Sequence, residues 1–450
     1  MITLFRHHIP IAASLQVLAD GVLYFAATLL AVHVALTPYG VATASVTGPA
    51  ILFSAIAVFV GAAFGLYRNA DNAAFAVQIG RAVLVVLVSA GAASLLFGFM
   101  QGGSDAKAVI GYIVLYSLAS VVVMRQIMLT ARRAGVGRRP VLIIGSRDEA
   151  REVEATLNRG LPKFTVAAFY DPASRAFSET ELCDVVQRLG VREVIVAVRD
   201  QRGGAVPMAQ LLACRISGIS VVDLAGFHER EHGQVPVHSL KSSWLVYGKG
   251  FAQDPVRTAV KRVFDVVCAL GLIVLAAPVM ILAALAIAVA SGRPVFYRQE
   301  RVGRGGRPIM CIKFRSMGTD AEKDGVARWA SKSDPRVTGV GRFLRQTRID
   351  ELPQLLNVLR GEMSLVGPRP ERPAFVKELS SAIPFYDVRH SVKPGITGWA
   401  QVRYSYGASV EDATRKLQYD LYYVKNHSLF LDIVVLVETV RVVLFGEGAH

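Results

Sequence analysis

Four long apolar stretches fill the first third of the chain, and they constrain the fold more than any other feature. They cover residues 10–36, 44–67, 77–100 and 108–129. Each is about long enough for a helix to cross a bilayer, which needs about 20 residues. An overall hydrophobic share of 52% in 450 residues is above that of ordinary soluble domains. The pattern predicts a four-helix transmembrane bundle over residues 1–136 and excludes a disordered or collagen-like chain.

Basic residues around these stretches predict their orientation, because Lys and Arg accumulate on the cytoplasmic side of a membrane. In an up-and-down array, Arg6, Arg81 and the cluster at 132–139 fall on one side. Lys107 falls on the other side. We therefore expect a multi-pass membrane protein in which both ends of the array are cytoplasmic.

A different pattern begins near Arg139, where short apolar runs alternate with amphipathic stretches. The apolar runs predict four strands, at 141–145, 165–170, 194–198 and 219–224. Such alternation is typical of a parallel sheet with crossover helices, so we expect a small α/β Rossmann-like domain over residues 137–250. The turn Gly145-Ser146-Arg147 has one glycine where a dinucleotide-binding fingerprint has three. A regulatory or oligomerising role is therefore favoured over binding of a nicotinamide cofactor.

A fifth apolar run, at 266–290, differs from the first four. Basic residues flank both of its ends: Lys261 and Arg262 before it, and Arg293 and Arg298 after it. A spanning helix should show an asymmetry of basic residues instead. Pro278 lies near the middle, where a proline bends or breaks a helix. We expect a re-entrant helix, about residues 263–292, that returns to the cytoplasmic side and belongs to a membrane-associated α/β catalytic domain at 257–450.

Cations are concentrated in residues 257–372, where Lys and Arg are about twice as frequent as Asp and Glu. A solvated face or contact with anionic lipid would explain some of this charge. Other cations stand beside Pro, Gly or aromatic residues that fix the backbone, as in 313–317 and 367–370. Rigidly held guanidinium groups suit phosphate oxygens. With a net charge of +15 in an apolar chain, lipid head groups and phosphorylated substrates are favoured over nucleic acid.

Asp350 and Glu351 stand just before Pro353 and a run of Leu and Val with helical spacing. Proline is tolerated in the first turn of a helix, so the two carboxylates should lie at a helix N-terminus. Adjacent acids at this position are most often a simple acidic first turn. Because cations surround them and a membrane helix precedes them, they also suit metal binding or attack on phosphorus. The pattern predicts a phosphoryl-transfer site.

Six motifs in the last 200 or so residues resemble one family, the polyprenyl-phosphate hexose-1-phosphate transferases, also called monotopic phosphoglycosyl transferases. They lie, in order, at 261–265, 294–303, 313–317, 350–358, 364–370 and 393–401. The front of the chain is similar in layout to the large polytopic subgroup, which adds four spans and a Rossmann-like module. The family serves bacterial exopolysaccharide, capsule and O-antigen synthesis.

The resemblance implies a reaction and a set of roles. Sugar 1-phosphate would pass from a UDP-sugar to polyprenyl phosphate, giving polyprenyl diphosphate sugar and UMP. Asp350 would be the nucleophile that forms a covalent phosphosugar intermediate, and Glu351 would support Mg²⁺. By their positions relative to the family's motifs, five cations would be substrate ligands: Lys313, Arg315, Arg345, Arg369 and Arg372. Pro278 matches the proline that breaks the family's re-entrant helix, although Ala277 stands where a serine often precedes it.

The partners that we expect are a UDP-sugar, polyprenyl phosphate and membrane lipids, with a homodimer as the assembly and no nucleic acid. The catalytic domain should face the cytoplasm at the bacterial inner (cytoplasmic) membrane. The main alternative is a membrane-bound nucleotide-sugar dehydratase, which needs a catalytic Tyr-x-x-x-Lys; no Lys in this sequence has a Tyr four residues before it. A non-enzymatic lipid-binding scaffold would leave the Asp350 and Glu351 pair unexplained.

Overall fold

The chain folds into two compact units, one around residues 9–227 and the other around residues 228–450. The computed structural model describes residues 2–4, 7–9, 11–36, 47–67, 75–98, 104–157, 164–171, 181–198, 206–237, 250–251, 255–321, 334–404, 407 and 409–445. Near the N-terminus, the short strands β1 (Ile2–Leu4) and β2 (His7–Ile9) form a two-stranded sheet.

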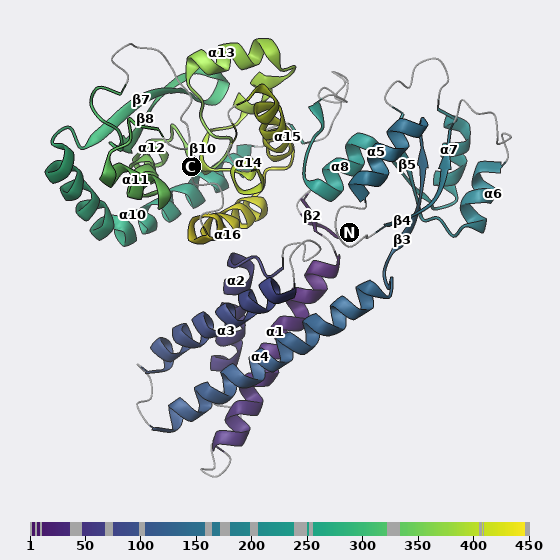
Figure 1. Ribbon diagram of the computed structural model, residues 1–450, viewed down its shortest axis with the longest axis horizontal. Helices are drawn as coiled ribbons and strands as arrows, with labels where there is room; N and C mark the ends of the chain where they lie inside the picture. The colour runs from purple at the N-terminus through teal and green to yellow at the C-terminus, as the bar shows by residue number, and fades with distance from the viewer. Residues whose placement is uncertain are drawn as a thin grey trace. The chain divides into compact units, whose positions relative to one another are not determined.

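Four apolar helices occupy the first part of the chain. They are α1 (Ile11–Leu36), α2 (Thr47–Ala63), α3 (Phe75–Gly98) and α4 (Ser104–Arg133). Each of α1 and α3 packs against both α2 and α4 (Figure 1). Among the described residues, α1 and α4 are long and apolar enough to cross a membrane, whereas α2 and α3 contain shorter apolar segments. The chain is thus a membrane protein, and crossing by all four helices stays a prediction.

A buried ion pair joins α1 to α4. Nη2 of Arg125 lies 2.6 Å from Oδ2 of Asp20, and both side chains are almost fully buried. The same guanidinium lies 5.9 Å from the centre of the Tyr67 ring. A charge in apolar surroundings is tolerated when it is paired, so this contact accounts for an aspartate in an otherwise apolar helix.

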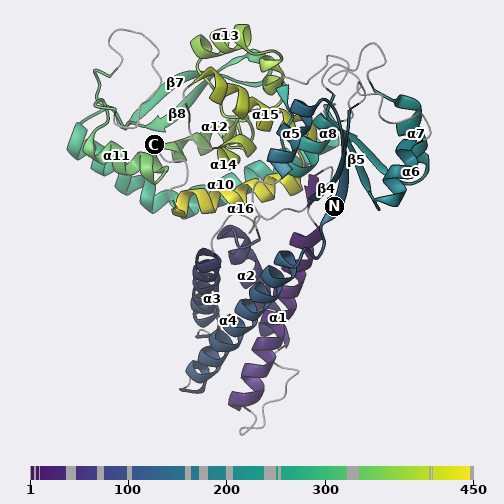
Figure 2. The same cartoon turned by 45° about the vertical axis from the view of Figure 1, so that its right-hand side comes forward.

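The rest of the first unit is a parallel four-stranded sheet with the order β4-β3-β5-β6. Its strands are β3 (Arg139–Ile144), β4 (Phe164–Tyr170), β5 (Glu193–Val196) and β6 (Ser220–Asp223). Apolar residues of α5 (Arg147–Leu157) and the start of α8 (Leu224–His232) pack on one face of the sheet. Those of α6 (Glu181–Arg188) and α7 (Met208–Ile216) pack on the other face (Figure 2). The predicted parallel sheet is confirmed, with strands near the expected positions.

The second unit combines a long helix, two small sheets and several short helices. The long helix is α10 (Pro255–Ser291). The antiparallel hairpin is β7 (Phe296–Val302) and β8 (Pro308–Phe314), and the parallel pair is β9 (Ser364–Val366) and β10 (Gly395–Thr397). The remaining helices are η5 (Arg304–Gly306), α11 (Gly339–Gln346), η6 (Ile349–Gln354), α12 (Leu355–Arg360), α13 (Pro373–Ala382), η7 (Tyr386–Ser391), α14 (Trp399–Arg403), α15 (Val410–Asn426) and α16 (Leu429–Phe445).

A short segment upstream of α10 belongs to the second unit. Nε1 of Trp399 donates a hydrogen bond to the carbonyl of Gly233 at 2.9 Å, and Lys425 forms an ion pair with Glu229 at 2.7 Å. Val235 is buried in the same core. The chain therefore divides between residues 227 and 228, upstream of the predicted boundary at residue 250. Residues 238–249 lie outside the described part of the chain.

The helix α10 is continuous through Pro278 and is long and apolar enough to cross a membrane. Most of its apolar side chains are exposed, and Leu275 and Val289 have exposed fractions of 78% and 88%. In its first half, Asp265 accepts a hydrogen bond from the backbone N–H of Leu365. In its second half, Ile287 packs in a small apolar cluster with Phe314 and Leu344. Both halves of α10 therefore contact other elements of the second unit.

Candidate active site

Asp350 and Glu351 lie in the first turn of η6, which runs directly into α12. The chain enters this turn through Arg348, whose φ of 59° is in the left-handed region and therefore unusual for a residue with a side chain. Pro353 lies inside η6, near the start of the combined helical segment. The predicted placement of both acids at the start of a helix is confirmed, although the first turn is a 3₁₀ turn.

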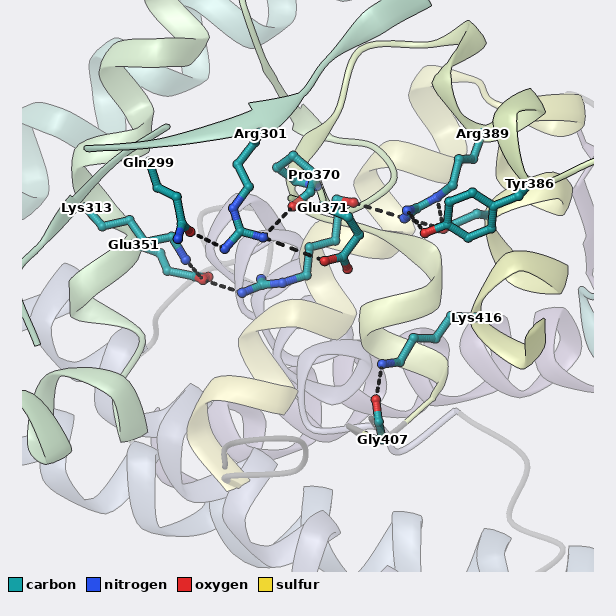
Figure 3. A network of polar contacts seen from close by, with 12 residues as sticks. Gln299, Arg301, Lys313, Glu351, Pro370, Glu371, Tyr386, Arg389, Gly407 and Lys416 are labelled. Atoms are coloured by element: carbon teal, nitrogen blue, oxygen red, sulfur yellow. Dashed lines mark hydrogen bonds and ion pairs between the residues drawn. The ribbon is translucent and has the colours of Figure 1, made fainter. Parts of the chain in front are cut away.

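Three cations hold the Glu351 carboxylate. Its Oε1 accepts hydrogen bonds from Nζ of Lys313 at 2.8 Å and from Nη2 of Arg369 at 2.9 Å (Figure 3). Nη1 of Arg348 lies 4.0 Å from Oε2. Burial by itself would raise the pKa of Glu351, but the charges of Arg369, Lys313 and Arg348 outweigh it and hold the pKa well below its usual range. Glu351 is therefore ionised and fixed in position.

Asp350 has the opposite environment. Its side chain is mostly buried and lines a cavity, yet among the described residues no hydrogen bond or ion pair reaches its carboxylate. Burial and then the charge of Glu351 raise the pKa of Asp350 to about 6, against the opposing charges of Lys313, Arg348 and Arg369. At neutral pH this carboxylate is mainly ionised, more basic than an ordinary aspartate, and open to the cavity.

The cavity has a volume of about 520 Å³, which is in the range of a small-molecule site. Cations outnumber carboxylates along its walls. The cations are Arg301, Lys313, Arg315, Arg336, Arg345, Arg348, Arg369, Arg372, Arg389 and Lys416, and the carboxylates are Asp350, Glu351, Glu371 and Asp420. Such an excess of positive charge favours an anionic ligand with more than one negative charge.

Two further arginines hold the Gly-Pro turn that carries Arg369. Nη2 of Arg389 donates to the carbonyl of Arg369 at 2.9 Å, and Nη1 of Arg301 donates to the carbonyl of Pro370 at 3.2 Å (Figure 3). Arg389 is itself buried and fixed by an ion pair with Asp420 at 2.8 Å. Successive carbonyls of the turn are thus restrained, which directs the Arg369 side chain toward Glu351.

The structure brings two of the five predicted substrate ligands directly to the acidic pair. Lys313 and Arg369 both contact Glu351. Arg345 and Arg372 line the same cavity, and the Arg372 guanidinium lies 5.9 Å from the ring centre of Phe375. Their roles as phosphate ligands stay predictions.

Arg315 is placed differently from the other predicted ligands. Its Nη2 donates hydrogen bonds to the carbonyls of Ser291 and Gly292, at 2.5 and 2.8 Å, so it caps the C-terminal end of α10. Its side chain also lines the cavity. Pro278 lies in the interior of α10 and is not among the lining residues. Arg315 therefore connects the apolar helix to the cavity wall.

Sequence reasoning missed three residues that organise the site: Arg301, Arg348 and Arg389. Arg348 stands only three residues before Glu351, so closeness in the sequence alone could have suggested this contact. Arg389 reaches Asp420, which is 31 positions away in the chain. No local pattern indicates that pair, because tertiary packing alone brings η7 against α15.

Mg²⁺ suits the donor set around the acidic pair. Two adjacent carboxylates are present, and one oxygen of Glu351 is already held by Lys313 and Arg369. Among the described residues no cluster of three or more His, Cys, Asp or Glu side chains could hold a metal by itself. Mg²⁺ commonly binds through one or two carboxylates and takes its other ligands from water and substrate phosphates. The residues present therefore fit an ion that arrives together with a phosphorylated substrate.

The second unit thus combines an exposed apolar helix with a cationic cavity that contains two unlike carboxylates, and this combination suits a phosphorylated ligand. Residues 256–446 match the family described as bacterial sugar transferase. The chain belongs to this family, because its matches cover more than two thirds of the length of several relatives that are at least 30% identical to it.

Three relatives illustrate the similarity. The UDP-N-acetylgalactosamine-undecaprenyl-phosphate N-acetylgalactosaminephosphotransferase of Aeromonas hydrophila is 42% identical over 240 residues, which is 53% of this chain and 56% of the relative. A UDP-glucose:undecaprenyl-phosphate glucose-1-phosphate transferase of Caulobacter vibrioides is 46% identical over 192 residues, 42% of this chain and 72% of the relative. A protein of the same description from Klebsiella pneumoniae is 32% identical over 337 residues, 71% of this chain and 70% of the relative.

Proposed function

We propose that this protein transfers a sugar 1-phosphate from a UDP-sugar to undecaprenyl phosphate, or a similar polyprenyl phosphate, with release of UMP. The product is a polyprenyl diphosphate sugar, which starts exopolysaccharide, capsule or O-antigen synthesis. The names of the three relatives support this reaction, since each includes undecaprenyl phosphate and a UDP-sugar. Membership of the sugar transferase family leaves the dehydratase hypothesis without support.

The different environments of the two carboxylates carry the proposal. Glu351 is tied to three cations, whereas Asp350 faces the cavity without a partner among the described residues and has a raised pKa. A carboxylate that is ionised yet more basic than usual is a suitable nucleophile toward phosphorus. The arrangement supports Asp350 as the attacking group and Glu351 as the organiser of the surrounding cations.

In the proposed first step, a carboxylate oxygen of Asp350 forms a bond to the phosphorus that bears the sugar. The bond from that phosphorus to the bridging oxygen breaks, and UMP leaves with the electron pair. In the second step, a phosphate oxygen of the lipid acceptor attacks the same phosphorus and releases the Asp350 carboxylate. Lys313 and Arg369 stand beside Glu351 and would offset the negative charge that develops on the phosphoryl oxygens.

Glu351 would hold Mg²⁺ when the donor is bound. The ion would neutralise part of the charge on the diphosphate, which otherwise repels an approaching carboxylate. Glu351 is a better candidate for the ligand than Asp350, because its Oε2 lies farther from the surrounding cations than its Oε1. Asp350 would then remain available for attack.

Contacts at both ends of α10 support a re-entrant course. Near its start, the guanidinium of Arg262 donates to the carbonyls of Val358 and Leu359 at the end of α12. At its other end, Arg315 binds the carbonyl of Ser291. A straight helix of this length would place its ends on opposite sides of a hydrocarbon core about 30 Å thick. One polar unit holds both ends, which favours entry and return on the same side, with a bend of the continuous helix at Pro278.

We also propose the wider arrangement. All four N-terminal helices would cross the bacterial inner membrane, and the catalytic unit would face the cytoplasm, where UDP-sugars occur. The parallel sheet with helices on both faces would act as a Rossmann-like regulatory or oligomerising module of a homodimer. Membrane lipids would surround the exposed apolar side chains of α10.

The test is an assay of the purified full-length protein with undecaprenyl phosphate, Mg²⁺ and a panel of UDP-sugars. We expect UMP release together with a lipid-linked sugar diphosphate for at least one donor, and loss of both on chelation of Mg²⁺. Absence of UMP release and of lipid product with every UDP-sugar, from well-folded protein, would contradict the proposal.

A further inference from the structure

The lining of the cavity comes from different segments of the second unit, and Glu351 contacts two of them. One oxygen of Glu351 binds Lys313 on the β7–β8 hairpin and Arg369 on the Gly-Pro turn. One part of the lining, which we call the α10 wall, comprises Pro294, Phe296, Tyr297, residues 313–318 and Arg345. It adjoins the end of α10 through the hydrogen bonds of Arg315 to Ser291 and Gly292. The rest of the lining includes Arg372, Arg389 and Lys416.

Two consecutive aromatic residues of β7 connect α10 to the acidic pair. Phe296 pairs with Phe314 across the hairpin, and Tyr297 pairs with Lys313. Residues paired directly across a ladder share a face, and successive residues point to opposite faces. Phe314 is buried against Ile287 of α10, whereas Lys313 binds Glu351. Phe296 therefore lies on the side of the apolar helix, and Tyr297 lies on the side of the reaction centre.

Both aromatic side chains are exposed although they line the cavity. Their exposed fractions are 46% for Phe296 and 39% for Tyr297, and the Phe296 ring stacks on Phe314 at 5.3 Å. They follow closely on the C-terminal end of α10, whose own apolar side chains are exposed. The apolar surface of α10 thus continues along these two rings into a cavity whose other lining residues are mostly charged.

We propose that Phe296 and Tyr297 form a track for the isoprenoid chain of the acceptor, along which the lipid phosphate reaches Asp350. The inference rests on the proposed function. Of the two substrates, only the acceptor has a long apolar chain that must stay out of water while its phosphate enters a polar cavity. Arg315 and Arg345 on the α10 wall supply positive charge for a phosphate monoester. The UDP-sugar, which has no such chain, is then left to the rest of the lining.

The test measures the KM of each substrate for the full-length enzyme at a fixed ratio of lipid to detergent. For Phe296→Ala and Tyr297→Ala we expect the KM for undecaprenyl phosphate to rise by about 10-fold, because apolar contact area is lost. The KM for the UDP-sugar and the kcat at saturating acceptor should stay as in the wild type. Phe296→Leu keeps an apolar side chain, so its KM for undecaprenyl phosphate should lie much closer to that of the wild type than the KM of Phe296→Ala does.

Met310→Ala is the matched control. Met310 lies on the same hairpin with an exposed fraction of 47%, but it is not among the residues that line the cavity. Its substitution should leave both KM values unchanged. An unchanged acceptor KM in both aromatic variants, or an equal rise in both KM values, would overturn the inference. A wild-type enzyme that forms no lipid product would instead overturn the proposed function, and that result is seen before any variant is made.

Discussion

At the scale of single residues, two neighbouring acids in the sequence become chemically unlike in the fold. Glu351 meets Lys313 from β8 and Arg369 from a turn far along the chain, so its charge is stabilised. Asp350 is buried beside that charge without a partner of its own among the described residues, so its pKa rises. Their positions relative to the three cations therefore make Glu351 a fixed anion and leave Asp350 reactive.

Glu351→Gln tests the role of the fixed anion. The change removes the negative charge between Lys313 and Arg369 and weakens any bound Mg²⁺, so we expect turnover to fall by about 10²- to 10³-fold. Initial rates measured against Mg²⁺ concentration should show partial recovery at high Mg²⁺, beyond the range that saturates the wild type. Glu300→Gln, on the exposed surface of β7, is the control and should change neither quantity. Wild-type rates with unchanged Mg²⁺ dependence in Glu351→Gln would refute this role.

At the scale of elements, α10 combines an exposed apolar surface with anchors at both ends. Lys261 also pairs with Asp432 of α16 at 2.7 Å, which fixes the first half of the helix against another helix of the same unit. Basic residues at both ends of the apolar run indicated this arrangement in the sequence. The particular anchors, Arg262 on α12 and Arg315 on the helix end, depend on tertiary packing.

Cysteine labelling checks the course of α10 directly. In a variant without native cysteines, Val256→Cys and Arg293→Cys should both react with a membrane-impermeant maleimide from the cytoplasmic side alone. The reason is that one polar unit holds both ends of the helix. Labelling in permeabilised cells shows that each position is accessible. Reaction of the two positions from opposite sides of the membrane would show that α10 crosses it.

At the scale of the whole molecule, the acidic pair and the cavity lie within the second unit. The parallel sheet of the first unit has its own core on each face. The segment that contains Glu229 and Gly233 packs with the catalytic unit, so a deletion that ends before it leaves those contacts in place. The sheet is thus a candidate for assembly or regulation rather than for chemistry.

Deletion of residues 141–224 should lower expression or assembly more than it lowers turnover per folded molecule. The physical reason is that no residue of this segment lines the cavity among the described residues. Size-exclusion chromatography and the UMP-release assay measure the two effects separately. A deletion variant that is stable and assembled like the wild type, yet wholly inactive, would show that the module takes part in the reaction.

Local patterns predicted much of this molecule. The length of apolar runs indicated α1, α4 and α10, and the alternation of short runs indicated the parallel sheet. The two acids and Pro353 indicated the start of a helix. Arg301 and Arg389 could not be found in this way, because their partners are main-chain carbonyls of a distant turn. The capping of α10 by Arg315 was missed for the same reason, since spacing shows which residues share an element but not which elements meet.

The most direct test of the central claim is the intact mass of the enzyme after mixing with a UDP-sugar and Mg²⁺ in the absence of lipid acceptor. Nucleophilic attack by Asp350 predicts an adduct of one sugar phosphate, located at Asp350 by peptide mapping, with UMP released before any acceptor is added. Asp350→Asn should fold normally, form no adduct and lose at least about a thousandfold in turnover. The absence of an adduct, together with near-normal turnover by Asp350→Asn, would contradict the account.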